Sequence, residues 1–205
     1  MILIAHRGDP RHALENTIQS FRQAAVRGAG AVEMDLRRRP GGNWVVFHDS
    51  LPKAVNGSLL ELPEALAFCR RRRLEAYLDV KDPRGESSLA RLIRSSRWLG
   101  HTTLLAGGPG TLRRWRRIFP RQPLFWVTGF REPLTPRKIA QARRLRLTGF
   151  VSYRRWVTRV SVERAHQAGL QVFVWTARTA ADLKRFARIG ADGIMSEVWP
   201  PPRSI

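Results

Sequence analysis

Eight short apolar runs alternate with amphipathic stretches along the whole of this 205-residue chain. The stretches repeat apolar residues at helical spacing, as Ile18, Phe21 and Ala25 do. Regular alternation of strands and helices favours a parallel sheet. The expected strands are Ile2–Ala5, Ala31–Leu36, Glu75–Val80, Thr103–Ala106, Leu124–Thr128, Phe150–Tyr153, Gln171–Trp175 and Gly193–Met195.

Proline and glycine mark several helix ends. Leu62-Pro63 and Thr135-Pro136 place a proline in the first turn of an expected helix, where its missing N–H costs nothing. Gly28, Gly169 and Gly190 follow helical stretches, at positions where a left-handed residue commonly ends a helix.

Both a closed (β/α)8 barrel and an open doubly wound sheet satisfy this alternation. Polar and aromatic residues decide between them, because they lie toward the carboxyl ends of different strands, which converge on one mouth only in a barrel. We therefore predict an α/β fold of the TIM-barrel type, formed by residues 1–205 as a single domain. The residues at these ends are His6, Glu33, Asp35, Asp79 and Trp175.

The barrel is expected to be trimmed, since such folds average about 250 residues. Three prolines in the segment from Val198 to Ile205 rule out a normal eighth helix. That flank must be covered by the proline-rich tail, by Trp199 or by a second subunit in a homo-oligomer.

Charge indicates an anionic partner. The chain holds 37 Lys and Arg against 16 Asp and Glu, a net charge of +21, which attracts phosphate esters, anionic membrane surfaces or nucleic acid. The arginines are scattered and apolar residues interrupt every basic run, which disfavours a nucleic-acid partner. A bias for arginine over lysine is also typical of genome composition or a hot habitat.

Nothing in the composition indicates a membrane or secreted protein. No stretch approaches the roughly 18 apolar residues of a membrane span, and the first strand runs straight into His6 without a leader pattern. Cys69 is the single cysteine and falls in an apolar helical stripe. We therefore expect a cytoplasmic protein in which Cys69 is a core residue.

Two carboxylates share one face of a buried strand. Side chains alternate along a strand, so Glu33 and Asp35 point one way while Val32, Met34 and Leu36 point the other. Two like charges so close repel unless a cation or a shared proton relieves them. We interpret the pair as part of a metal site.

A third acid and a lysine follow in Asp79-Val80-Lys81 and again share a strand face. Asp79 would supply another oxygen ligand and Lys81 a cation for phosphate oxygens; an internal Asp–Lys ion pair is the structural alternative. Three carboxylates without cysteine or a histidine cluster suit a hard divalent cation, Mg²⁺ or Ca²⁺.

Two histidines are expected near these acids. His6-Arg7-Gly8 ends the first strand, and a hairpin arm after Pro40 would return His48-Asp49 to the same region. A histidine pair suits acid–base catalysis, although a structural histidine in a turn explains either one alone. Arg7 offers a planar fork for phosphate.

Glu15-Asn16-Thr17 opens the first expected helix. Thr17 or Asn16 would act as its N-cap, and Glu15 as a favourable first-turn acid. Glu15 and Asn16 could equally support the site from above the mouth.

In these motifs the chain resembles the glycerophosphodiester phosphodiesterases, over nearly its full length and in the same order. The resemblance implies a barrel with His6 and His48 as the acid/base pair, and with Glu33 and Asp35 as metal ligands. It also implies Arg7 and Lys81 as phosphate contacts. The matching motifs are His6-Arg7-Gly8, Glu15-Asn16-Thr17, Glu33-Met34-Asp35, His48-Asp49, Asp79-Val80-Lys81, Trp175-Thr176 and Gly190-Ala191-Asp192-Gly193-Ile194.

Four departures from the family pattern affect specificity. The third metal ligand, usually Glu in the family, is Asp79 here. Where the family has an insertion, this chain has only the segment from Ser50 to Glu61. The fourth strand ends in Ala106-Gly107-Gly108 instead of Ser-Phe. Ser196-Glu197 replaces the final Thr-Asp. The phosphate-handling residues are kept while the cap over the substrate is shortened.

The implied reaction is metal-dependent hydrolysis of a glycerophosphodiester through a cyclic phosphate, with Trp175 packing on the glycerol or serving as a core residue. One alternative is a lysophospholipase D-like enzyme at an anionic membrane, with Trp115, Trp126 and Trp156 on a basic surface. The other is a nucleic-acid-binding barrel with a vestigial site.

Overall fold

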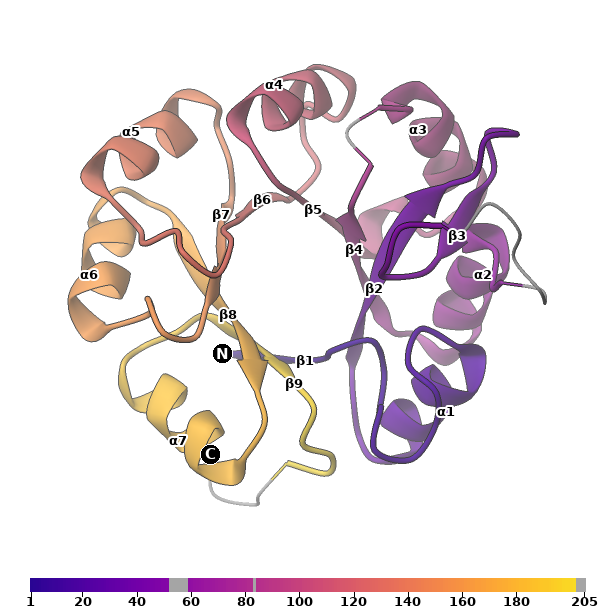
Figure 1. The fold of residues 1–205 in the computed structure, drawn as a ribbon, viewed down its shortest axis with the longest axis horizontal. Coiled ribbons are helices and arrows are strands. Elements are labelled where there is room, and N and C mark those ends of the chain that lie inside the picture. The colour runs from indigo at the N-terminus through magenta and orange to yellow at the C-terminus, as the bar shows by residue number, and fades with distance from the viewer. Residues whose placement is uncertain (52–58, 83, 202–205) are drawn as a thin grey trace.

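The predicted strands close into a parallel barrel in the computed structural model, which describes residues 1–51, 59–82 and 84–201 (Figure 1). Neighbouring barrel strands run in the order β1-β9-β8-β7-β6-β5-β4-β2, and pairing of β1 with β2 closes the ring. The barrel prediction is confirmed, and the open sheet is wrong. The strands are β1 Ile2–Ala5, β2 Ala31–Arg38, β3 Trp44–Val46, β4 Glu75–Val80, β5 Thr102–Ala106, β6 Leu124–Val127, β7 Gly149–Tyr153, β8 Gln171–Ala177 and β9 Gly193–Ser196.

Helices surround the barrel (Figure 1). A helix follows every barrel strand except β9, after which the described residues, up to Pro201, contain none. The predicted loss of the last helix therefore holds for this part of the chain. The helices are α1 Ile18–Val26, α2 Leu62–Arg72, α3 Glu86–Ser95, α4 Pro109–Ile118, α5 Pro136–Arg144, α6 Arg159–Gln167 and α7 Ala180–Arg188, with a 3₁₀ turn at Leu99–His101.

Helix ends follow the sequence signals. Pro63 lies in the first turn of α2, and Thr135 caps α5 by accepting a hydrogen bond from the Lys138 N–H at 3.3 Å. The glycines after α1, α6 and α7 have φ of 91°, 72° and 85°, a region that side chains disfavour.

Strand β3 lies outside the ring and pairs antiparallel with the end of β2, with Leu36 opposite Val46. The Arg37 guanidinium donates to the His48 carbonyl at 3.1 and 2.9 Å, and the Phe47 N–H donates to the Asp35 carbonyl at 2.9 Å. This confirms the predicted hairpin arm, which brings His48 back to the carboxyl end of the barrel.

The barrel has two apolar cores, one between the strands and the helices and one inside the ring of strands. Val32, Met34 and Leu36 pack outward in the core that includes the helices, so Glu33 and Asp35 face the interior. Below them the interior is filled by a second cluster with close aromatic contacts. It comprises Ile4, Ala31, Tyr77, Leu105, Phe125, Val151, Phe173 and Met195.

The C-terminal segment contributes to the outer core. Trp199 is 6% exposed and packs there, while its indole N–H donates to the Ser196 carbonyl at 3.1 Å. Trp199 thus covers part of the flank where a helix after β9 would lie, which was one of the three arrangements predicted.

The expectation of a tryptophan-bearing basic surface is wrong for two of its three residues. Trp115 is fully buried and Trp126 is 4% exposed. Trp115 lies on the inner face of α4 with Leu112, three residues earlier, and Trp126 packs in the outer core. Only Trp156 is partly exposed.

Two further sequence predictions meet different outcomes. Residues 52–58, which form most of the shortened insertion, lie outside the described residues. Cys69 is fully buried in the outer core, as predicted.

In the part of the chain that the structure describes, no helix has both the length and the apolar content needed to cross a bilayer.

Candidate active site

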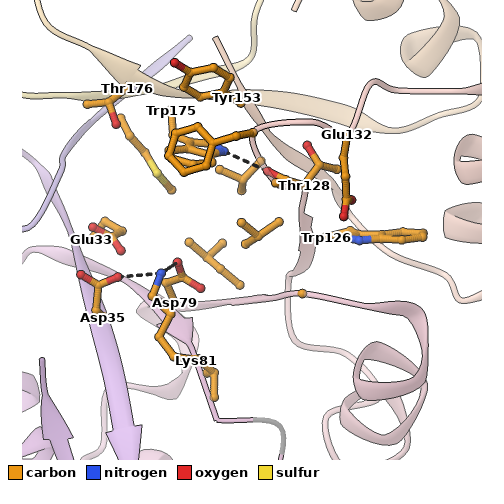
Figure 2. Close-up of a pocket in the computed structure, with 18 of the residues that line it drawn as sticks. Glu33, Asp35, Asp79, Lys81, Trp126, Thr128, Glu132, Tyr153, Trp175 and Thr176 are labelled. Atoms are coloured by element: carbon orange, nitrogen blue, oxygen red, sulfur yellow. Dashed lines mark hydrogen bonds and ion pairs between the residues drawn. The ribbon is translucent and has the colours of Figure 1, made fainter. Parts of the chain in front are cut away.

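Three carboxylates meet at the carboxyl ends of β2 and β4 (Figure 2). The parallel register places Asp35 opposite Asp79, and Glu33 points the same way two residues earlier on β2. Carboxylate oxygens of the three lie within 4.8 Å of one another. Glu33 and Asp35 are each 1% exposed, and the Asp79 side chain is 14% exposed.

Two cations and an amide balance the negative charge of Asp35. Burial alone would raise its pKa, but Lys81, Arg7 and the Asn16 amide hold the pKa of Asp35 below its usual value. Lys81 Nζ lies 2.9 Å from Asp35 Oδ1, Arg7 Nε lies 2.9 Å from Oδ2, and Asn16 Nδ2 donates to Oδ2 at 2.9 Å. Lys81 also contacts Asp79 (Figure 2). Asp35 is therefore ionised in the folded protein.

Glu33 is in the opposite situation. Burial, followed by the charges of Asp35 and Asp79, raises the pKa of Glu33 well above its ordinary value. Within the described residues, the Glu33 carboxylate accepts one hydrogen bond, from the Arg7 backbone N–H at 3.0 Å. Burial also raises the pKa of Asp79, against the effect of Lys81.

The acid cluster fits a hard divalent cation. Three acids share two cationic neighbours, and Glu33 has no ion-pair partner in the described ranges. A bound divalent ion would relieve that repulsion, and an all-oxygen donor set suits Mg²⁺ or Ca²⁺ rather than Zn²⁺. The structure also supports the alternative for Lys81, since its ammonium forms the internal ion pair with Asp79.

Replacing Lys81 with methionine is expected to destabilise the metal-free protein by about 3–5 kcal/mol, because removing one partner leaves buried charges uncompensated. Urea unfolding in chelator would measure this. Lys138→Met is the matched control: Lys138 pairs at 3.1 Å with Glu132, whose side chain is 50% exposed, and such a pair contributes about 1 kcal/mol or less. Equal effects of the two substitutions would contradict this account of the acid cluster.

His6 directly follows β1 and lines the pocket. It has a carboxylate neighbour that was not predicted from the sequence. Its Nδ1 is 3.4 Å from Glu197 Oε1, and the His6 side chain is 12% exposed. The hydrogen bond from His6 lowers the pKa of Glu197 against the effect of burial. Glu197 directly follows β9, a position at the barrel mouth that could have revealed it.

His48 reaches the same pocket from the hairpin arm. Its Nδ1 lies 2.8 Å from Asp49 Oδ1, and its side chain is 40% exposed. The structure therefore gives each histidine a carboxylate neighbour that can orient its ring. All the sequence-predicted site residues except Asn16, which lies behind Asp35, line this pocket.

Residues around the first loop support the acids. Arg7 Nη1 donates to Glu15 Oε1 at 2.8 Å, which ties the loop before α1 to the acid cluster. Thr17 caps α1 by accepting from the Ser20 N–H at 3.2 Å, so its capping role is confirmed. Asn16 instead makes a two-way contact with Asp35, whose N–H donates to Asn16 Oδ1 at 3.2 Å.

The pocket has a volume of about 1380 Å³. Aromatic side chains line it on the side away from the acids (Figure 2). The ring of Phe130 lies 4.7 Å from Tyr153 and 4.8 Å from Trp175, centre to centre. Trp175 is held by its indole N–H, which donates to the Thr128 carbonyl at 3.3 Å. Sequence reasoning named Trp175 but missed Phe130, which lies in a loop without periodic signal.

This site geometry agrees with a family match. Residues 6–81 and 99–198 match the model of the glycerophosphoryl diester phosphodiesterase family. The chain belongs to this family and is a phosphodiesterase.

Individual relatives support the match along the chain. A glycerophosphodiester phosphodiesterase from Caldanaerobacter subterraneus is 23% identical over 232 residues, covering 96% of this chain and 93% of the relative. Glycerophosphodiester phosphodiesterase 1 from Bos taurus is 51% identical over 109 residues, or 38% of this chain and 33% of the relative.

Solved structures show the same fold. A glycerophosphoryl diester phosphodiesterase from Silicibacter pomeroyi superposes with a TM-score of 0.86 at 19% identity, covering 98% of this chain and 90% of that one. A phosphodiesterase from Oleispira antarctica, solved with its product sn-glycerol-3-phosphate, superposes with a TM-score of 0.85 at 18% identity, covering 96% and 93%.

Proposed function

We propose that the pocket hydrolyses glycerophosphodiesters to glycerol 3-phosphate and an alcohol, with the help of a divalent cation. The observation that carries this proposal is that two histidines and three acids from distant parts of the chain line one pocket. The product held by the Oleispira antarctica relative supports glycerol 3-phosphate as the product here.

Glu33, Asp35 and Asp79 would hold the cation, Mg²⁺ or Ca²⁺. When bound, it polarises the phosphate and lowers the pKa of a hydroxyl beside it. Asn16 and Arg7 keep Asp35 ionised and oriented for this role.

His6 and His48 would transfer the protons. In the first step, the substrate's own glycerol hydroxyl attacks phosphorus, one histidine accepts its proton, and the other protonates the departing alcohol. Water then opens the resulting cyclic phosphate with the two roles exchanged. Glu197 and Asp49 fix the Nδ1 side of each ring, which leaves Nε2 for the substrate.

Arg7 and Lys81 would offset charge on the phosphoryl oxygens. Both contact Asp35, so positive charge is concentrated where the phosphate would meet the acids. Trp175 would pack against the carbon skeleton of the glycerol on the opposite wall. Residues 1–205 would act as one catalytic domain.

Incubating the purified protein with glycerophosphocholine and Mg²⁺ or Ca²⁺ tests this proposal. We expect ³¹P NMR to show glycerol 3-phosphate appearing as the diester is consumed. A lysophospholipid assayed in parallel tests the lysophospholipase D alternative. If glycerophosphocholine is not cleaved with either metal, the proposed function is wrong, and cleavage of the lysophospholipid alone would favour the alternative.

A further inference from the structure

Three exposed apolar side chains lie around the rim of the barrel mouth, in segments that follow β1, β6 and β7. Leu14, Phe130 and Val160 are 78%, 63% and 53% exposed. They lie in the loop before α1, in the loop before α5 and in the first turn of α6, all of which follow carboxyl ends of parallel strands. Because those strand ends share one face of the barrel, the three residues lie on the rim of that face, with the loops after β1 and β6 on opposite sides of the mouth.

Phe130 is held in place by its surroundings. Its ring meets Tyr153 and Trp175 edge to face, and its carbonyl accepts the Trp156 indole N–H at 2.7 Å. Trp156 is itself partly exposed, with the Arg155 guanidinium 5.5 Å from its ring centre. A fixed aromatic side chain with a neighbouring indole and cation is typical of a surface that meets both apolar and polar groups.

The same rim is basic. Arg11, Arg131, Arg155 and Arg178 are exposed in the loops that follow β1, β6, β7 and β8. Of the acids near them, Glu132 pairs with a lysine, Asp49 lies beside His48, and Glu197 Oε2 lies 3.6 Å from Arg178 Nε. The chain as a whole carries +21, so an anionic surface would be attracted from a distance and would meet this rim favourably.

We propose that the mouth rim, defined as Leu14, Phe130, Val160 and these four arginines, docks on an anionic lipid bilayer. Apolar side chains flanked by arginines match the boundary between acyl chains and anionic headgroups, where each basic residue near the surface contributes about 1 kcal/mol. A nucleic acid would account for the arginines but not for exposed Leu14. Docking would turn the pocket toward the membrane. Such docking does not depend on the reaction proposed for the pocket.

Co-sedimentation with vesicles tests this inference. We expect the protein to sediment with phosphatidylcholine vesicles that contain phosphatidylglycerol and much less with phosphatidylcholine alone. Leu14→Ser and Phe130→Ser should each weaken binding about tenfold, since each removes one buried apolar side chain. Val26→Ser is the matched control: Val26 is 74% exposed but ends α1 at the opposite face of the barrel, so binding should not change.

Several results would overturn the proposal. They are no sedimentation with anionic vesicles, an equal loss in the Val26 control, or unchanged binding in both rim variants, which would indicate attraction by charge alone. Tight binding of duplex DNA that is unchanged in the two rim variants would indicate a nucleic-acid partner instead. Leu14→Ser should keep the turnover of soluble glycerophosphocholine, so failure of docking and failure of the proposed function are measured separately.

Discussion

Replacing His6 or His48 by alanine is expected to lower turnover of glycerophosphocholine by about 10²–10⁴-fold while leaving the fold intact. Each ring lines the pocket beside the acid cluster, and loss of either removes one of the two proton carriers that the reaction needs. Steady-state kinetics would measure the loss, and circular dichroism would check the fold.

Two histidines far from the pocket serve as controls. His166 is 41% exposed and 2.8 Å from Asp192, much as His48 is from Asp49, but it lies at the end of α6, at the opposite face of the barrel. His101 Nδ1 lies 2.7 Å from Glu75 Oε1, and the His101 side chain is 51% exposed. His166→Ala and His101→Ala should leave turnover unchanged. Full activity in both His6→Ala and His48→Ala would exclude the acid–base roles.

Removing divalent metal is expected to abolish activity, and adding Mg²⁺ or Ca²⁺ should restore it. The three acids form the only cluster of this kind among the described residues, and the cation that they would hold polarises the phosphate. Activity assayed in EDTA, then after a metal series, gives the result directly. Unchanged turnover in chelator would rule out the metal role of the acids.

Glu33→Gln separates metal binding from stability. In the metal-free protein the substitution should not lower the melting temperature, because it removes a carboxyl whose charged form is disfavoured by burial and by the neighbouring acids, and it keeps an oxygen to accept the Arg7 N–H. Metal at 100 times its Kd should stabilise the unchanged protein by about 2.7 kcal/mol, roughly 5–10 °C, and the variant hardly at all. A metal-dependent rise of equal size in the variant would contradict the assignment of Glu33 as a ligand.

The barrel could be predicted because its strands are short and their apolar period is clear. The alternation in β2 placed Glu33 and Asp35 on one face and Val32, Met34 and Leu36 on the other, which the structure confirms. The hairpin before His48 was also predictable from its turn residues. Strand ends differ by one or two residues, because polar residues such as Arg37 and Arg38 extend β2 where hydrogen bonding continues.

Side-chain environments were harder to predict, because they depend on contacts between distant segments. Trp115 and Trp126 were expected at the surface, although the Leu112–Trp115 spacing on α4 indicated a buried stripe. Glu197 drew notice only as a departure from the family pattern, and its contact with His6 requires β9 to lie beside β1. Lys81 was expected to meet phosphate, whereas its ammonium lies between Asp35 and Asp79.

The central claim is that Glu33, Asp35 and Asp79 share one divalent cation at the barrel mouth. A crystal structure of the protein grown with Mn²⁺, with anomalous diffraction recorded for the metal, tests it most directly. We expect one strong peak at coordination distance, about 2.0–2.6 Å, from oxygens of all three carboxylates, with the Lys81 ammonium moved away from the acids. No peak at saturating metal, with Lys81 still between Asp35 and Asp79, would contradict the account.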